Sequence, residues 1–161
     1  MKVKTILVPL DGSALAEAAV TPAVELARER GATLLLLRAA EGRTALLADP
    51  TEAQVHAVRE AEAYLAAVRE RLLAARLTDV DVSVWYGSPA EAIVEAAKYR
   101  AADLIVMSSH GRTGLGRLML GSVAETVLRS TAVPVLLIRP GSAPLDTPAP
   151  GTTGARELSH V

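Results

Sequence analysis

Short apolar runs alternate along the chain with longer stretches in which apolar residues recur at helical spacing. The run 32–40, with four consecutive leucines, is typical of a strand buried on both faces. In 79–84, valines alternate with Asp and Ser, which indicates an edge strand with one polar face. Pro134 lies within the last run, and proline is tolerated at a strand's start or at an edge. We predict five strands, over Lys4–Leu10, Ala32–Ala40, about residues 80–84, Asp103–Met107 and Val133–Arg139.

The two longest stretches between strands carry the start and stop signals of helices. Ser13 can cap the first helix, Gly31 stops it, and Pro22 should bend or split it. Asp49 followed by Pro50 is an N-cap with proline at the first helical position, and apolar residues then recur along one face. We predict helices over about 13–30 and 50–75, with a loop over 41–48.

Two later segments have the spacing of a capping box, in which a serine is followed three residues on by a glutamate. Ser88 precedes Glu91, and Ser122 precedes Glu125. Both serines are therefore predicted N-caps, of helices that end near Tyr99 and Ser130.

Strands and helices alternate five times, which is typical of an α/β protein with a doubly wound parallel sheet. The alternating strand near residue 82 and the proline-containing last strand are both predicted edges. We expect one domain over residues 1–140, and a flexible tail over 141–161, where Pro, Gly and Thr predominate.

Composition removes several classes of function. The 161 residues carry a net charge of −1, which argues against a nucleic-acid binder with a basic surface. The absence of cysteine excludes disulfides, thiol catalysis and thiolate metal sites. No apolar run approaches the roughly 20 residues that cross a bilayer. The apolar run near the N-terminus is too short for the hydrophobic region of a signal peptide. We therefore expect a cytoplasmic protein without membrane or nucleic-acid partners.

A glycine-rich loop follows the fourth predicted strand and leads to the start of the last predicted helix. The free backbone N–H groups at a helix start favour anions, so this segment indicates an anion site. A phosphate-binding P-loop is rejected, since Arg117 and Leu118 replace the required Lys and Ser/Thr. The dinucleotide fingerprint is rejected too, because Met119 occupies its third glycine position.

A longer pattern, Gly-x2-Gly-x9-Gly-Ser/Thr, fits better, with Gly111, Gly121 and Ser122 in place and Ser108 at the first glycine position. The segment 107–140 that contains it resembles the C-terminal part of the universal stress protein family. Residues 6–13 (ILVPLDGS) resemble that family's opening strand and turn, and residues 87–91 (GSPAE) its third strand–helix turn.

The resemblance implies sheet order 3-2-1-4-5, an adenine nucleotide alpha-hydrolase-like fold, and a crevice outside strands 1 and 4, where the winding reverses. It further implies an ATP-binding stress-response module, with Mg²⁺ carried by the phosphates, and a homodimer paired through Val135, Leu136, Leu137 and Ile138. The predicted ligand-binding residues are Pro9, Asp11, Ala39, Met107, Ser108, His110, Gly111, Arg112, Gly121, Ser122 and Val123.

Several of these residues have a second interpretation. Asp11 is either a ligand for ribose or metal-bound water, or a turn residue that bonds its own backbone. Ala39 is either a backbone partner of the base or plain strand-end packing. His110 and Arg112 are either ligand contacts or surface residues. If position 108 requires a left-handed backbone, serine there should cost roughly 1–2 kcal/mol of conformational free energy relative to glycine.

Catalytic signals are missing from the motifs. No Lys follows the glycines, and no nucleophile is paired with a base by motif. We expect at most slow ATP hydrolysis. The alternative hypothesis is a stress protein that binds no nucleotide and acts through contacts with partner proteins.

Overall fold

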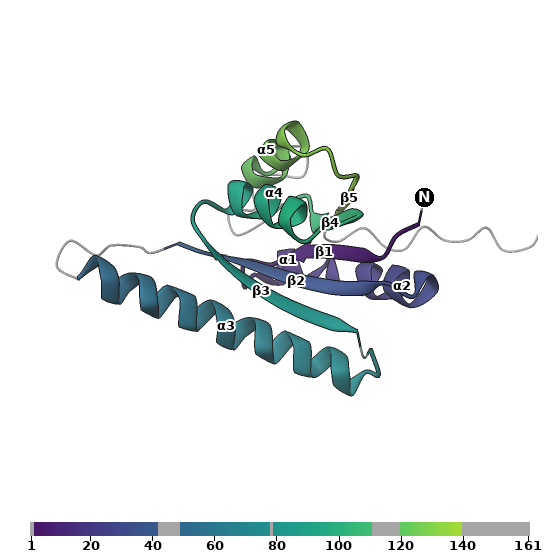
Figure 1. The fold of residues 1–161 in the computed structure, drawn as a ribbon, viewed down its shortest axis with the longest axis horizontal. Helices are drawn as coiled ribbons and strands as arrows, with labels where there is room; N and C mark the ends of the chain where they lie inside the picture. Colours follow the sequence, from purple (N-terminus) through teal and green to yellow (C-terminus); the bar gives the residue numbers. More distant parts are fainter. Residues whose placement is uncertain (1, 42–48, 78, 111–119, 140–161) are drawn as a thin grey trace, which may run out of the picture.

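A computed structural model describes residues 2–41, 49–77, 79–110 and 120–139, so the predicted tail lies outside the described part of the chain. Five parallel strands form one sheet in the order β3-β2-β1-β4-β5, which confirms the predicted topology (Figure 1). The elements are β1 (Thr5–Pro9), α1 (Ala14–Glu17), α2 (Val20–Arg30), β2 (Thr33–Ala40), α3 (Pro50–Ala74), β3 (Val80–Tyr86), α4 (Pro89–Tyr99), β4 (Leu104–Ser108), α5 (Ser122–Ser130) and β5 (Val135–Ile138).

The alternation of side chains along the central strands divides the core into two layers. Ile6 and Leu34 pack with the apolar residues of α1, α2 and α3 on one face. Leu7 and Leu35 pack with those of α4 and α5 on the other. In Figure 1, α3 runs below the sheet, and α4 and α5 lie above it. The leucine run of β2 is fully buried because helices cover both faces.

The helix predicted over 13–30 is split, as the proline suggested, but the break lies at Ala18 and Ala19, before Pro22. Pro22 is the third residue of α2, within the first turn, where a backbone N–H has no helical acceptor. The break therefore places the proline where its missing N–H costs nothing.

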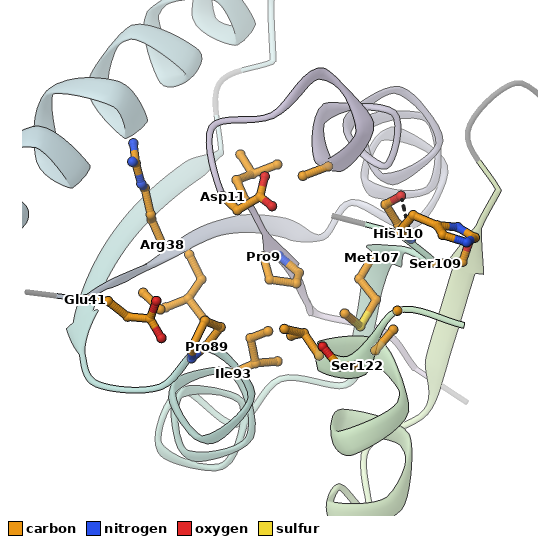
Figure 2. Close-up of a pocket in the computed structure, with 18 of the residues that line it drawn as sticks. Pro9, Asp11, Arg38, Glu41, Pro89, Ile93, Met107, Ser109, His110 and Ser122 are labelled. Carbon is orange, nitrogen blue, oxygen red and sulfur yellow. Dashed lines mark hydrogen bonds between the residues drawn. The ribbon is translucent and has the colours of Figure 1, made fainter. Parts of the chain in front are cut away.

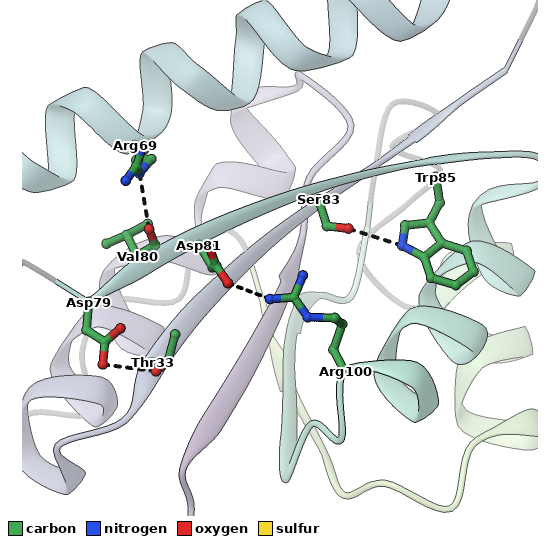
Figure 3. Close-up of polar contacts among 8 residues, drawn as sticks. All are labelled: Thr33, Arg69, Asp79, Val80, Asp81, Ser83, Trp85 and Arg100. Carbon is green, nitrogen blue, oxygen red and sulfur yellow. Dashed lines mark hydrogen bonds and ion pairs between the residues drawn. The ribbon is translucent and has the colours of Figure 1, made fainter.

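Strand β3 is an edge strand, as its alternating sequence predicted. Long side chains from neighbouring helices reach it: Arg69 Nε of α3 donates to the Val80 carbonyl at 3.1 Å, and Arg100 pairs with Asp81 (Figure 3). Trp85 donates its indole N–H to the Ser83 hydroxyl at 3.1 Å on the side of the sheet that α4 covers. Charged side chains thus cover part of this edge.

Strand β5, predicted over 133–139, is shorter and begins after Pro134. The proline has no N–H to give to a ladder, but its carbonyl accepts the Ile105 N–H at 2.9 Å. The last strand is an edge, as predicted, and its Leu136 side chain is 38% exposed.

One predicted capping box is wrong. Ser88 occupies the N-cap position of α4, but its side chain makes no hydrogen bond to the first turn. Ser88 is exposed, so water can satisfy its hydroxyl, and Pro89 takes the first helical position as predicted.

Candidate functional site

A cavity of about 250 Å³ opens at the carboxyl ends of β1, β2 and β4 (Figure 2). The first turns of α4 and α5 bound it on one side, and Ala57 and Glu60 of α3 on another. This is the position where the winding of the sheet reverses, between β1 and β4.

Nine of the eleven predicted ligand-binding residues line this cavity, although they come from four separate parts of the chain. They are Pro9, Asp11, Ala39, Met107, Ser108, His110, Gly121, Ser122 and Val123. The other two, Gly111 and Arg112, lie outside the described residues. Their roles toward a ligand remain predictions.

Asp11 lines the cavity and also makes the local turn that was its alternative interpretation. Its carboxylate accepts the Ser13 N–H at 2.9 Å and the Ser13 hydroxyl at 2.6 Å. The Ser13 hydroxyl in turn accepts the Ala16 N–H at 3.1 Å and caps α1. Gly12, at φ +83°, supplies the left-handed backbone that this turn needs. The turn fixes the Asp11 carboxylate at the cavity.

Ser108 does not carry the backbone strain that its replacement of glycine suggested. Among the described residues, the non-glycine positions with positive φ are Arg76 and Ala101. Ser108 is the last residue of β4 and is buried, and its hydroxyl accepts the His110 N–H at 3.3 Å. The expected cost of a left-handed serine therefore does not arise here.

Gly121, not Ser122, is the N-cap of α5, so the predicted capping box is wrong. Gly121 donates to the Ser109 carbonyl at 2.8 Å, and an added Cβ would lie 3.0 Å from that oxygen. This contact is tighter than a Cβ normally makes, which favours glycine at the cap, and Ser122 takes the first helical position. Glu125, one residue beyond capping-box spacing, pairs with Arg129 instead.

The start of α5 forms part of the cavity wall and carries the partial positive charge of a helix N-terminus. The first N–H groups of a helix have no helical acceptor, and they lie at the positive end of its dipole. Gly121 has no side chain to occupy them, and no side-chain cap bond is formed. Ser122, Val123 and Ala124 line the cavity. This wall is chemically suited to an anion.

The sequence motifs do not include Arg38, the one charged residue of the leucine-rich strand β2. It is 8% exposed and lines the cavity, and its guanidinium pairs with Glu60 at 2.8 Å. It also lies over the Tyr64 ring, 4.9 Å from the centroid. A lone arginine within a leucine-rich strand was the available signal. Its partners on α3 could not be identified without the fold.

Tyr64 belongs to the same group of side chains. Its hydroxyl donates to Glu17 at 2.8 Å. Burial, followed by this hydrogen bond and the charge of Glu17, raises the pKa of Tyr64, because each disfavours the phenolate. Tyr64 is therefore neutral and links α1 to α3.

A second missed feature is the contact between Ser109 and His110. The Ser109 hydroxyl lies 2.9 Å from His110 Nδ1, so a hydroxyl and a base are paired, contrary to our expectation from the motifs. Figure 2 places both residues at the opposite end of the site from Arg38, with Pro9 between.

The described residues contain no group of three or more His, Asp or Glu side chains that could hold a metal ion. They also contain no helix long and apolar enough to span a membrane. The cavity thus has a helix start suited to an anion at one end, an apolar middle and a carboxylate-bearing end.

Known proteins resemble this chain along most of its length. The family described as "Universal stress protein family" matches residues 2–139. A universal stress protein of Thermus aquaticus is 39% identical over 141 residues, which cover 84% of this chain and 98% of that protein.

Solved structures agree with the fold. UspA of Lactobacillus plantarum superposes with a TM-score of 0.73 at 28% identity, covering 86% of this chain and 99% of that one. A universal stress protein solved in complex with cAMP superposes with a TM-score of 0.61 at 28% identity, covering 86% and 98%.

Proposed function

The chain belongs to the universal stress protein family, and from that premise we propose that its cavity binds an adenine nucleotide. ATP is the proposed form, with Mg²⁺ carried by the phosphates. The protein would then serve as a nucleotide-dependent stress-response module with at most slow ATP hydrolysis.

The observation that carries this proposal is the uncapped start of α5 in the cavity wall. Phosphate oxygens would accept hydrogen bonds from the amides of Ser122 and Val123, where the helix dipole favours negative charge. Gly121 keeps this surface free of side-chain atoms. Gly111, Arg112 and His110 are the further predicted phosphate contacts.

The rest of the cavity suits a nucleoside. Pro9, Ala39 and Met107 present apolar surface and strand-end backbone for the adenine ring. The fixed Asp11 carboxylate can accept hydrogen bonds from ribose hydroxyls. The relative solved with cAMP binds an adenine nucleotide, and this chain shares its fold at 28% identity.

Ser108 is compatible with this ligand. Its backbone has no positive φ, and its hydroxyl already bonds the His110 N–H, so it does not project an unpaired polar group into the cavity. The replacement of glycine at this position is therefore no obstacle to the proposed binding.

Extraction of the natively purified protein tests the proposal against the alternative of a nucleotide-free stress protein. We expect an adenine nucleotide to be released on denaturation, and Mg-ATP to give calorimetric heat and a thermal shift. No heat and no shift at millimolar Mg-ATP would overturn the proposal.

Gly121→Ala sharpens this test. The added Cβ meets the Ser109 carbonyl oxygen, which is backbone and cannot move away easily, so the start of α5 must shift. We expect ATP affinity to fall by about tenfold or more, which corresponds to about 1.4 kcal/mol. Leu128→Ala, at an exposed position on the same helix, is the control and should leave affinity unchanged.

We also propose that two chains pair through β5. The strand is an edge with apolar residues, and such edges pair with another strand unless they are covered.

A further inference from the structure

Arg38 is the one charged side chain that is buried among the described residues. Its guanidinium lies between the Tyr64 ring and the turn at Gly12, where an added Cβ would be 3.6 Å from Arg38 Nη1. Figure 2 shows Arg38 directed toward α3, away from Ser122 and His110. The residue thus belongs to the end of the cavity opposite the proposed phosphate site.

Carboxylates predominate at this end. Asp11, Glu41 and Glu60 line the cavity together with Arg38, which leaves a net charge of −2. The Glu60 side chain is 59% exposed, whereas that of Arg38 is 9% exposed. The ion pair therefore joins a buried cation to a carboxylate that water can reach.

We infer that the Arg38–Glu60 pair is a specificity determinant, which makes the cavity exclude nucleotides that carry a second phosphate group on a ribose hydroxyl. This inference rests on the proposed function, because it requires the nucleoside to lie with its ribose near Asp11. Ribose hydroxyls can donate to the carboxylates of this end. A phosphate at the 3′ position would place negative charge beside them.

The pairing with Glu60 is what makes Arg38 unavailable to such a phosphate. An unpaired guanidinium is a strong phosphate ligand, because its planar donors match two oxygens at once. A buried cation that loses its partner also gains most from a new anion, since the surroundings do not solvate it. Removal of the Glu60 charge should therefore turn a site that excludes a second phosphate into one that accepts it.

Calorimetric titration with AMP and with adenosine 3′,5′-bisphosphate tests the inference, with Mg-ATP as the reference ligand. We expect the wild-type protein to bind the bisphosphate about tenfold more weakly than AMP, because like charges repel at this end. This comparison requires no variant, so it holds whatever the effect of a substitution on folding. Equal affinity for the two ligands would overturn the inference and leave the proposed function intact.

Glu60→Gln keeps an oxygen that can accept from Arg38 but removes the charge. We expect the preference for AMP to shrink by about tenfold or to reverse in this variant. In the double variant Arg38→Gln, Glu60→Gln, the net charge again equals the wild-type value and no guanidinium is present, so the wild-type preference should return. Glu62→Gln, at an exposed position on α3, is the matched control and should change nothing.

The outcomes distinguish the role of the ion pair from nucleotide binding itself. An unchanged preference in folded Glu60→Gln, or a relaxed preference in the double variant, would overturn the role of the ion pair alone. If the wild-type protein binds none of the three nucleotides, the proposed function fails and the inference falls with it.

Discussion

At the scale of single residues, Asp103 joins β1 to β4 from a position just before the second of these strands. Its carboxylate accepts the Lys4 N–H at 2.7 Å and the Thr5 N–H at 3.0 Å. These backbone hydrogen bonds, that of Lys4 first, hold the pKa of Asp103 below its ordinary value of 3.8, because they favour the charged carboxylate. The residue predicted as the first of a strand is instead a side-chain link between two strands.

The lowered pKa predicts how stability depends on pH. The contribution of Asp103 is present above the ordinary carboxyl pKa and is lost as pH falls through the lower folded-state value. Asp103→Asn should therefore reduce the urea midpoint at pH 7, and the difference from wild type should shrink toward pH 3. Glu70→Gln, an exposed carboxyl on α3, should show no such convergence. An Asp103→Asn effect that is equal at both pH values would contradict the link.

At the scale of elements, the ends of the helices show where local sequence suffices. Ser13, Asp49 and Gly31 act at helix ends as their residue types predict. Ser88 and Ser122 do not act as side-chain caps. The two failures are at the helices whose first turns line the cavity. The helix starts that lack the expected side-chain cap are thus the ones at the candidate site.

Gly31 gives a direct test of a helix stop. It adopts φ 61° and ψ 42° after α2, and an added Cβ would meet no atom within 4 Å. Gly31→Ala should then cost about 1 kcal/mol of unfolding free energy from the backbone alone. Gly31→Asn should cost less, because Asn tolerates this conformation better. Denaturant unfolding measures both, and equal stability of Gly31→Ala and wild type would contradict the assignment.

At the scale of the whole molecule, the sheet ends in two edges of different character. Arg69 and Arg100 contact β3, with Arg69 bonded to its Val80 carbonyl (Figure 3). Strand β5 has apolar residues throughout, and no side-chain contact of this kind joins it within the described residues. The proposed pairing between chains is therefore assigned to β5.

The two edges offer a matched pair of substitutions, because Leu136 and Val82 are both 38% exposed. Leu136→Asp should convert the proposed dimer to a monomer in sedimentation velocity, since it buries a charge in the paired strand. Val82→Asp should leave the dimer intact. A dimer that survives Leu136→Asp, or dissociates with Val82→Asp, would refute the β5 interface.

The sequence by itself determined the type and order of the elements. Side-chain directions repeat every two residues in a strand and every 3.6 in a helix. The spacing of apolar residues therefore shows which element forms and which of its faces is buried. The alternating valines identified one edge for the same reason, and Pro134 identified the other because proline has no N–H to give to a ladder. Nine of the predicted ligand-binding residues line one cavity, because loops that follow parallel strands meet at one end of the sheet.

Tertiary structure decided what depends on contacts between distant segments. The close contact with the Ser109 carbonyl favours glycine at position 121, the cap of α5. Arg38 is buried because Glu60, 22 residues away, supplies its counter-charge. No local pattern encodes such contacts, since the partners meet only after the sheet has formed and the helices have packed on it.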